Sequence, residues 1–128
     1  MVGDCGLPTV DCRLKKLNYM INSDIKISIV IPVYNAQSTI SKLVNQLISE
    51  ISAHYNLEIV LVNDYSSDNS HRECLKLYNE NKDKVKYITL ARNFGEHNAV
   101  MAGLNKVSGD FTIIMDDDFI EKYNINKI

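Results

Sequence analysis

The sequence alternates between short apolar runs and segments with a helical pattern, and this alternation restricts the fold more than any other feature. Four runs are rich in β-branched residues and almost continuously apolar, as expected for strands that are covered on both faces. They lie at 26–33, 57–63, 85–90 and 111–115. Strands that alternate with helices need crossover connections. We therefore predict an α/β fold in three layers, with helices on both faces of a mostly parallel sheet.

The segment after the first predicted strand has the clearest helical pattern. Its apolar residues recur at intervals of three and four, which places them on one face of a helix. They are Ile40, Leu43, Val44, Leu47, Ile48 and Ile51. Ser38 or Thr39 is the predicted N-cap. Two further helices are predicted, one from the polar loop at 64–70 to about Glu80 and one at about 99–106.

Composition excludes several classes of protein. A formal net charge of −2 on 128 residues provides no bulk positive field for nucleic acid, so we expect no nucleic-acid partner. The apolar runs are much shorter than the roughly 20 residues of a membrane helix, and no secretory signal is visible. The three cysteines lack the spacing of a metal site. We interpret them as reduced, buried thiols of a cytoplasmic protein.

The two ends of the sequence differ from the part between them. Residues 1–24 show neither helical nor strand periodicity, and we hypothesise that they are a leader and that Met20 is the natural start. The patterned domain is predicted at 25–119. Residues 120–128 are predicted to be a tail outside it.

Polar residues follow all four predicted strands. In an open parallel sheet, ligands bind at the carboxyl ends of the strands. The polar segments there are YNAQS, NDYSSD, ARNFGEHN and DDD. Neither the GxGxxG motif of dinucleotide-binding folds nor the GxxxxGK[ST] motif of a P-loop is present. A phosphate group at this edge of the sheet would need another partner.

The three adjacent aspartates can provide that partner. Asp116 and Asp118 are one residue apart, so their carboxylates can converge on one divalent cation. Mg²⁺ and Mn²⁺ prefer such oxygen ligands and are often bound by one or two carboxylates together with substrate phosphates. The alternative is a strand exit with solvated aspartates, which are common in turns.

Other polar residues at the strand ends have two interpretations each. Asp64 can accept a hydrogen bond from a base or a ribose hydroxyl, or it can be a turn or cap residue. Tyr34 and Asn35 suit a planar base but equally suit a turn. Arg92 and His97 follow the third strand, where either could face a phosphate or be structural. Two further histidines are predicted to be surface residues: His54 and His71.

Together these segments resemble a known family. The blocks SIVIPVYNAQSTI, EIVLVNDYSSDNS, LARNFGEHNAVMAGLNKVSGDF and IIMDDDF are similar to successive blocks of family 2 glycosyltransferases, which have the GT-A fold. The resemblance is strongest to the branch that transfers a sugar from a nucleotide sugar to dolichyl or undecaprenyl phosphate. It covers about 27–119 and implies the nucleotide-binding half of a GT-A fold.

The resemblance also implies roles for individual residues. The nucleotide-sugar-binding residues would be Pro32, Tyr34, Asn35, Asp64, Arg92 and Asp116. Asp116 and Asp118 would form a DxD pair that binds Mg²⁺ or Mn²⁺. Asn93 and Gly95 match the family's RNFG block. The donor would be a UDP- or GDP-linked sugar and the acceptor a polyprenyl phosphate or a glycan. We then expect a cytoplasmic protein, with a peripheral position at the inner face of the membrane.

This sequence departs from the family after the aspartates. The branch usually has Gln where this chain has Ile120, and residues 121–128 do not resemble it. Two milder departures are Ala36, where the family often has Glu, and Asn63-Asp64-Tyr65-Ser66, where the family often reads Asp-Asp-Gly-Ser. We expect a truncated transferase in which no general base can be named, and whose fourth strand is an exposed edge that favours self-association. The alternatives are an inactive nucleotide-binding fragment and a receiver-like regulatory module.

Overall fold

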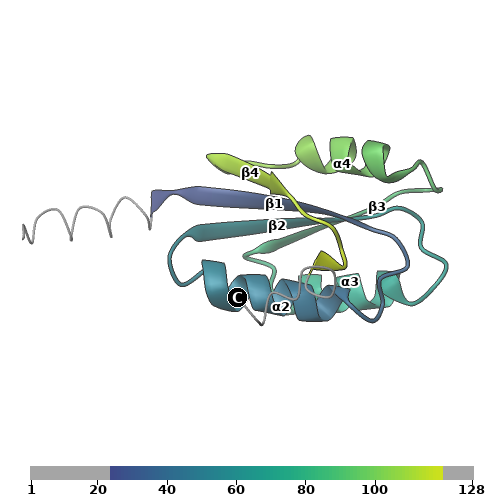
Figure 1. The fold of residues 1–128 in the computed structure, drawn as a ribbon, viewed down its shortest axis with the longest axis horizontal. Coiled ribbons are helices and arrows are strands. Elements are labelled where there is room, and N and C mark those ends of the chain that lie inside the picture. The colour runs from purple at the N-terminus through teal and green to yellow at the C-terminus, as the bar shows by residue number, and fades with distance from the viewer. Residues whose placement is uncertain (1–23, 120–128) are drawn as a thin grey trace, which may run out of the picture.

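A computed structural model describes residues 24–119, which form a four-stranded parallel sheet (Figure 1). The strands are β1 (Lys26–Val33), β2 (Asn56–Asn63), β3 (Val85–Thr89) and β4 (Phe111–Ile114), in the order β3-β2-β1-β4. Every neighbouring pair is parallel. The predicted strands and the parallel α/β fold are therefore confirmed. The predicted leader, apart from Asp24, and the predicted tail lie outside the described residues.

Helices cover both faces of the sheet. Helices α2 (Ile40–Ile51) and α3 (Ser70–Glu80) lie on one face, and α4 (Glu96–Leu104) lies on the other (Figure 1). The predicted start of α4 at residue 99 was wrong, because its first turn is polar and shows no apolar periodicity. Thr39 occupies the N-cap of α2, as predicted, but its side chain makes no capping hydrogen bond. Within the described residues, no helix has the length and apolar content to cross a membrane.

Two layers of core side chains hold the helices to the sheet. Alternate residues of β1 point to opposite faces. Ile29 and Ile31 pack with α2 and α3, whereas Val30 packs with Ala99 of α4. Helix α4 lies close to the sheet at Gly103, which has no side chain. A Cβ atom at this position would lie 2.5 Å from the Val30 side chain.

A buried carboxylate joins the strands at the end of the sheet opposite their carboxyl termini. Glu58 is 4% exposed and accepts hydrogen bonds from the Ser28 hydroxyl at 2.6 Å and the Ser108 N–H at 2.8 Å. The Lys86 ammonium lies 2.6 Å from the other carboxylate oxygen of Glu58. Burial alone would raise the pKa of Glu58, but the hydrogen bonds from Lys86, Ser28 and Ser108 outweigh it and lower this pKa to about 2.

Strand β4 is an exposed edge, as predicted. Three of its four side chains are large, apolar and exposed: Phe111 (63%), Ile113 (42%) and Ile114 (53%). The opposite edge strand, β3, carries Lys86. Charged residues on an edge discourage pairing with other chains, and β4 has none. The open side of β4 is therefore the more probable surface for strand pairing.

We predict that this edge causes self-association. Sedimentation velocity of the wild-type chain should show an average mass that rises with concentration, because β4 offers unpaired backbone groups and apolar side chains. Ile114→Lys should shift the chain towards monomer, whereas Thr89→Lys on the opposite edge should not. A wild-type chain that stays monomeric over the concentration range would contradict the prediction.

Candidate functional site

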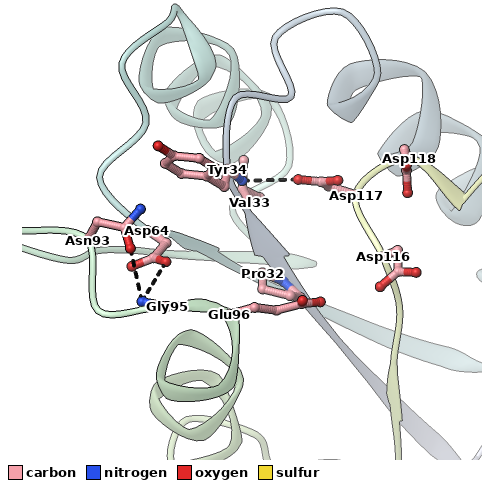
Figure 2. A pocket seen from close by; sticks show the side chains of 10 residues that line it. All are labelled: Pro32, Val33, Tyr34, Asp64, Asn93, Gly95, Glu96, Asp116, Asp117 and Asp118. Carbon is pink, nitrogen blue, oxygen red and sulfur yellow. Dashed lines mark hydrogen bonds between the residues drawn. The ribbon is translucent and has the colours of Figure 1, made fainter.

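A pocket of about 400 Å³ lies at the carboxyl ends of the strands (Figure 2). All four strand ends contribute to it, which confirms the predicted location of the polar residues. The residues that line it are Pro32, Val33, Tyr34, Asp64, Asn93, Gly95, Glu96, Asp116, Asp117 and Asp118. Four of the residues predicted to bind nucleotide are among them: Pro32, Tyr34, Asp64 and Asp116.

The end of β1 forms one wall of this pocket. Pro32 is buried at the end of the strand, where its missing N–H does not interrupt the sheet. Tyr34 is the first residue after β1 and is 50% exposed, so its aromatic ring is available to a ligand. These positions agree with the predicted contact to a planar base, which stays a prediction.

Asn35 does not line the pocket but holds the loop after β2. Its side-chain oxygen accepts hydrogen bonds from the backbone N–H groups of Ser67 at 2.8 Å and Asp68 at 3.3 Å. Its φ of 49° is in the left-handed region, which asparagine tolerates better than most residues. The structure thus gives Asn35 a contact to protein, and its predicted contact to nucleotide is untested.

Asp64 is buried at the end of β2 and contacts the loop after β3. It is 3% exposed, and its two oxygens accept the backbone N–H groups of Phe94 at 2.8 Å and Gly95 at 3.0 Å. Gly95 has a φ of 94°, a conformation that favours glycine. Each carboxylate oxygen has two lone pairs. Asp64 can therefore hold this loop and still accept a hydrogen bond from a ligand in the pocket.

The two cationic candidates after β3 do not line the pocket. The guanidinium of Arg92 lies over the ring of Phe94, 4.7 Å from its centroid. His97 is exposed on the first turn of α4. A phosphate contact by either residue stays a prediction. His54 and His71 are exposed, as predicted, and Cys74 is buried, as predicted for a structural thiol.

The three aspartates after β4 differ in their surroundings. Asp117 accepts the backbone N–H of Tyr34 at 3.0 Å, whereas Asp118 is exposed (Figure 2). Burial raises the pKa of the Asp117 carboxyl above its ordinary value, and the charges of Asp118 and Asp116 add to this effect. Asp117 thus joins the segment after β4 to the segment after β1.

The lining of the pocket is strongly acidic. Five of the ten described lining residues are carboxylates, and none of the ten is lysine, arginine or histidine. No group of three or more His, Cys, Asp or Glu side chains among residues 24–119 is arranged to hold a metal ion. Two carboxylates nevertheless fit Mg²⁺ or Mn²⁺, because these ions usually complete their coordination with water and substrate phosphates. Asp116 and Asp118 therefore remain suitable ligands.

Two acidic lining residues were missed by the sequence analysis. Glu96 faces the pocket at the start of α4, and Asp117 faces the end of β1. The signal for Glu96 was its place directly after the RNFG block. Asp117 was not predicted as a lining residue, because alternate side chains of an extended segment point to the same side. That rule places Asp116 and Asp118 together and directs Asp117 away from them.

Comparisons with known proteins place the chain in a family. Residues 28–124 match the model of glycosyl transferase family 2. Undecaprenyl-phosphate 4-deoxy-4-formamido-L-arabinose transferase of Yersinia enterocolitica is 43% identical over 96 residues. The match covers 73% of this chain and 29% of that protein, so the chain spans less than a third of the curated relative's length.

Solved structures of similar fold include two complexes with nucleotide. TarS 1-349 of S. aureus in complex with UDP has a TM-score of 0.62 and 28% identity, covering 73% of this chain and 28% of that one. GalNAc-T7 with UDP, GalNAc and Mn²⁺ has a TM-score of 0.63 and 29% identity, covering 73% and 18%. The fold and the match over residues 28–124 lead to one conclusion: this chain belongs to glycosyl transferase family 2 and has part of a GT-A fold.

Proposed function

We propose that this chain binds a nucleotide-diphosphate sugar together with Mg²⁺ or Mn²⁺ and that it is the donor-binding part of a glycosyltransferase. The acidic pocket at the carboxyl ends of β1, β2, β3 and β4 is the observation that carries this proposal. A diphosphate is an anion, and a pocket lined by five carboxylates repels it. A divalent cation bound between the carboxylates and the diphosphate would turn this repulsion into attraction.

Asp116 and Asp118 are the proposed metal ligands. Both line the pocket directly after β4, and a strand end is a firm support for a binding site. The bound metal would stabilise the negative charge that develops on the leaving nucleoside diphosphate. The protein itself would orient the donor through the end of β1 and through Asp64.

Related proteins support the choice of ligand. The TarS structure contains UDP, and the GalNAc-T7 structure contains UDP and Mn²⁺. We therefore propose a UDP-linked donor, and a GDP-linked donor is the alternative that the resemblance of the sequence implies. Arg92 and Asn35 are proposed to contribute to nucleotide binding from outside the pocket wall, Arg92 through its charge and Asn35 by holding the loop after β2.

The acceptor and the location are proposed from the Yersinia relative. The name of the Yersinia transferase includes undecaprenyl phosphate. We propose a polyprenyl phosphate as the acceptor and a position in the cytoplasm, at the inner face of the membrane.

Isothermal titration with UDP and with GDP tests the proposal. We expect binding of one of the two in the presence of Mn²⁺, and loss of that binding when EDTA replaces the metal. The physical reason is that the acidic pocket attracts a diphosphate only after a cation has reduced its negative charge. Absence of binding to both nucleotides with saturating Mn²⁺ would contradict the proposal and favour an inactive fragment.

A further inference from the structure

Polar side chains at successive strand ends each hold the loop of the neighbouring strand. Asp117, after β4, accepts the N–H of Tyr34, after β1. Asn35, after β1, accepts N–H groups of the loop after β2. Asp64, after β2, accepts N–H groups of the loop after β3. These contacts follow the sheet order from β4 to β3, so the loops of the pocket are fixed to one another one by one.

The contact made by Asp117 lies three residues beyond the end of β4. A backbone hydrogen bond joins this chain segment to β1, from the Met115 N–H to the Val30 carbonyl at 3.0 Å. Beyond Met115 the chain turns away, and the Phe119 N–H bonds the Asp116 carbonyl at 3.2 Å. The Asp117 carboxylate connects this turn back to β1 (Figure 2).

We propose that Asp117 is a positioning residue that holds the turn of residues 116–119 against the end of β1, so that its two neighbours face the pocket. This inference rests on the proposed function, because Asp116 and Asp118 are the proposed metal ligands. Groups that orient metal ligands from outside the coordination shell typically affect metal affinity by 10- to 100-fold. Asp117 would act through its hydrogen bond and would not touch the metal.

Two variants separate the hydrogen bond from the charge. Asp117→Asn and Asp117→Ala both remove the negative charge, but only asparagine keeps an oxygen that can accept the Tyr34 N–H. We expect Asp117→Ala to lower the Mn²⁺-dependent affinity for nucleotide by about 10- to 100-fold. Asp117→Asn should stay within about threefold of wild type, since a retained hydrogen bond keeps the turn in place. Titration calorimetry on the full chain measures both.

Amide hydrogen exchange, followed by NMR, tests the contact without any ligand. The Tyr34 amide should exchange at least tenfold faster in Asp117→Ala than in wild type or Asp117→Asn, because a lost hydrogen bond exposes it to water. The amides of Val30 and Ile31, which lie in the centre of the sheet, should be unchanged. A general loss of stability would instead accelerate them together with Tyr34.

The outcomes distinguish this inference from the proposed function. Failure of the wild-type chain to bind nucleotide with Mn²⁺ would defeat the proposed function, and the exchange rates at Tyr34 would still decide whether Asp117 holds the turn. Equal Tyr34 exchange in wild type and Asp117→Ala would overturn the positioning role. An equal loss of affinity in the alanine and asparagine variants would also overturn it, since charge would then be the cause.

Discussion

Asp118→Ala should abolish the Mn²⁺-dependent affinity for nucleotide while leaving the fold intact. Asp118 is exposed and lines the pocket, so its removal leaves no cavity in the core. Mg²⁺ and Mn²⁺ sites of this kind depend on one or two protein carboxylates. We expect a loss of about 100-fold or more, which corresponds to at least roughly 2.7 kcal/mol of binding free energy.

Titration calorimetry with and without Mn²⁺ measures this loss. Asp83→Ala is a matched control, because it removes an exposed aspartate from the loop before β3, where its partner is the adjacent Lys84. The melting temperatures of both variants should stay close to wild type. Equal nucleotide binding by Asp118→Ala and wild type would remove Asp118 from the metal site.

Glu58→Ala should destabilise the fold by about 3 kcal/mol. The carboxylate is buried and ionised, and it bonds groups from β1, from the loop before β4 and from β3. Removing one partner of a buried ion pair costs about 3–5 kcal/mol, and Lys86 is half exposed, which favours the lower end of that range. For a domain with a total stability of about 5–15 kcal/mol, the loss is large. Urea denaturation with linear extrapolation measures it.

The same residue predicts a dependence of stability on pH. The pKa of Glu58 is lowered from 4.5 to about 2 in the folded chain, so the folded state favours the ionised form. Its contribution is fully present above pH 4.5 and is lost as the pH falls towards 2. Glu58→Gln should lack this part of the acid transition, whereas Glu50→Gln, on the exposed side of α2, should retain it. Identical acid transitions in Glu58→Gln and wild type would contradict the assignment.

The strands and the location of the site could be predicted because both depend on repeated local patterns. Runs of β-branched residues gave β1 to β4, and the rule for parallel sheets placed the pocket at their carboxyl ends. Patterns of this kind do not specify the partner of a side chain. From the sequence, Asn35 and Asp64 could therefore be interpreted as ligand contacts or as turn residues, but the neighbouring loop that each one bonds could not be named. The hydrogen bond between Glu58 and Ser108 could not be predicted either, because it joins β2 to a loop that lies 50 residues further along the chain.

The distribution of polar contacts along the strands has a consequence for how such a domain can diverge. Glu58 and its partners stabilise one end of the sheet, and the carboxylates of the pocket lie at the other. Substitutions in the loops at the pocket are expected to leave the distant cluster unweakened, because effects at well-separated sites add independently. The opposite ends of the same strands can thus change independently, because one end stabilises the fold and the other lines the pocket.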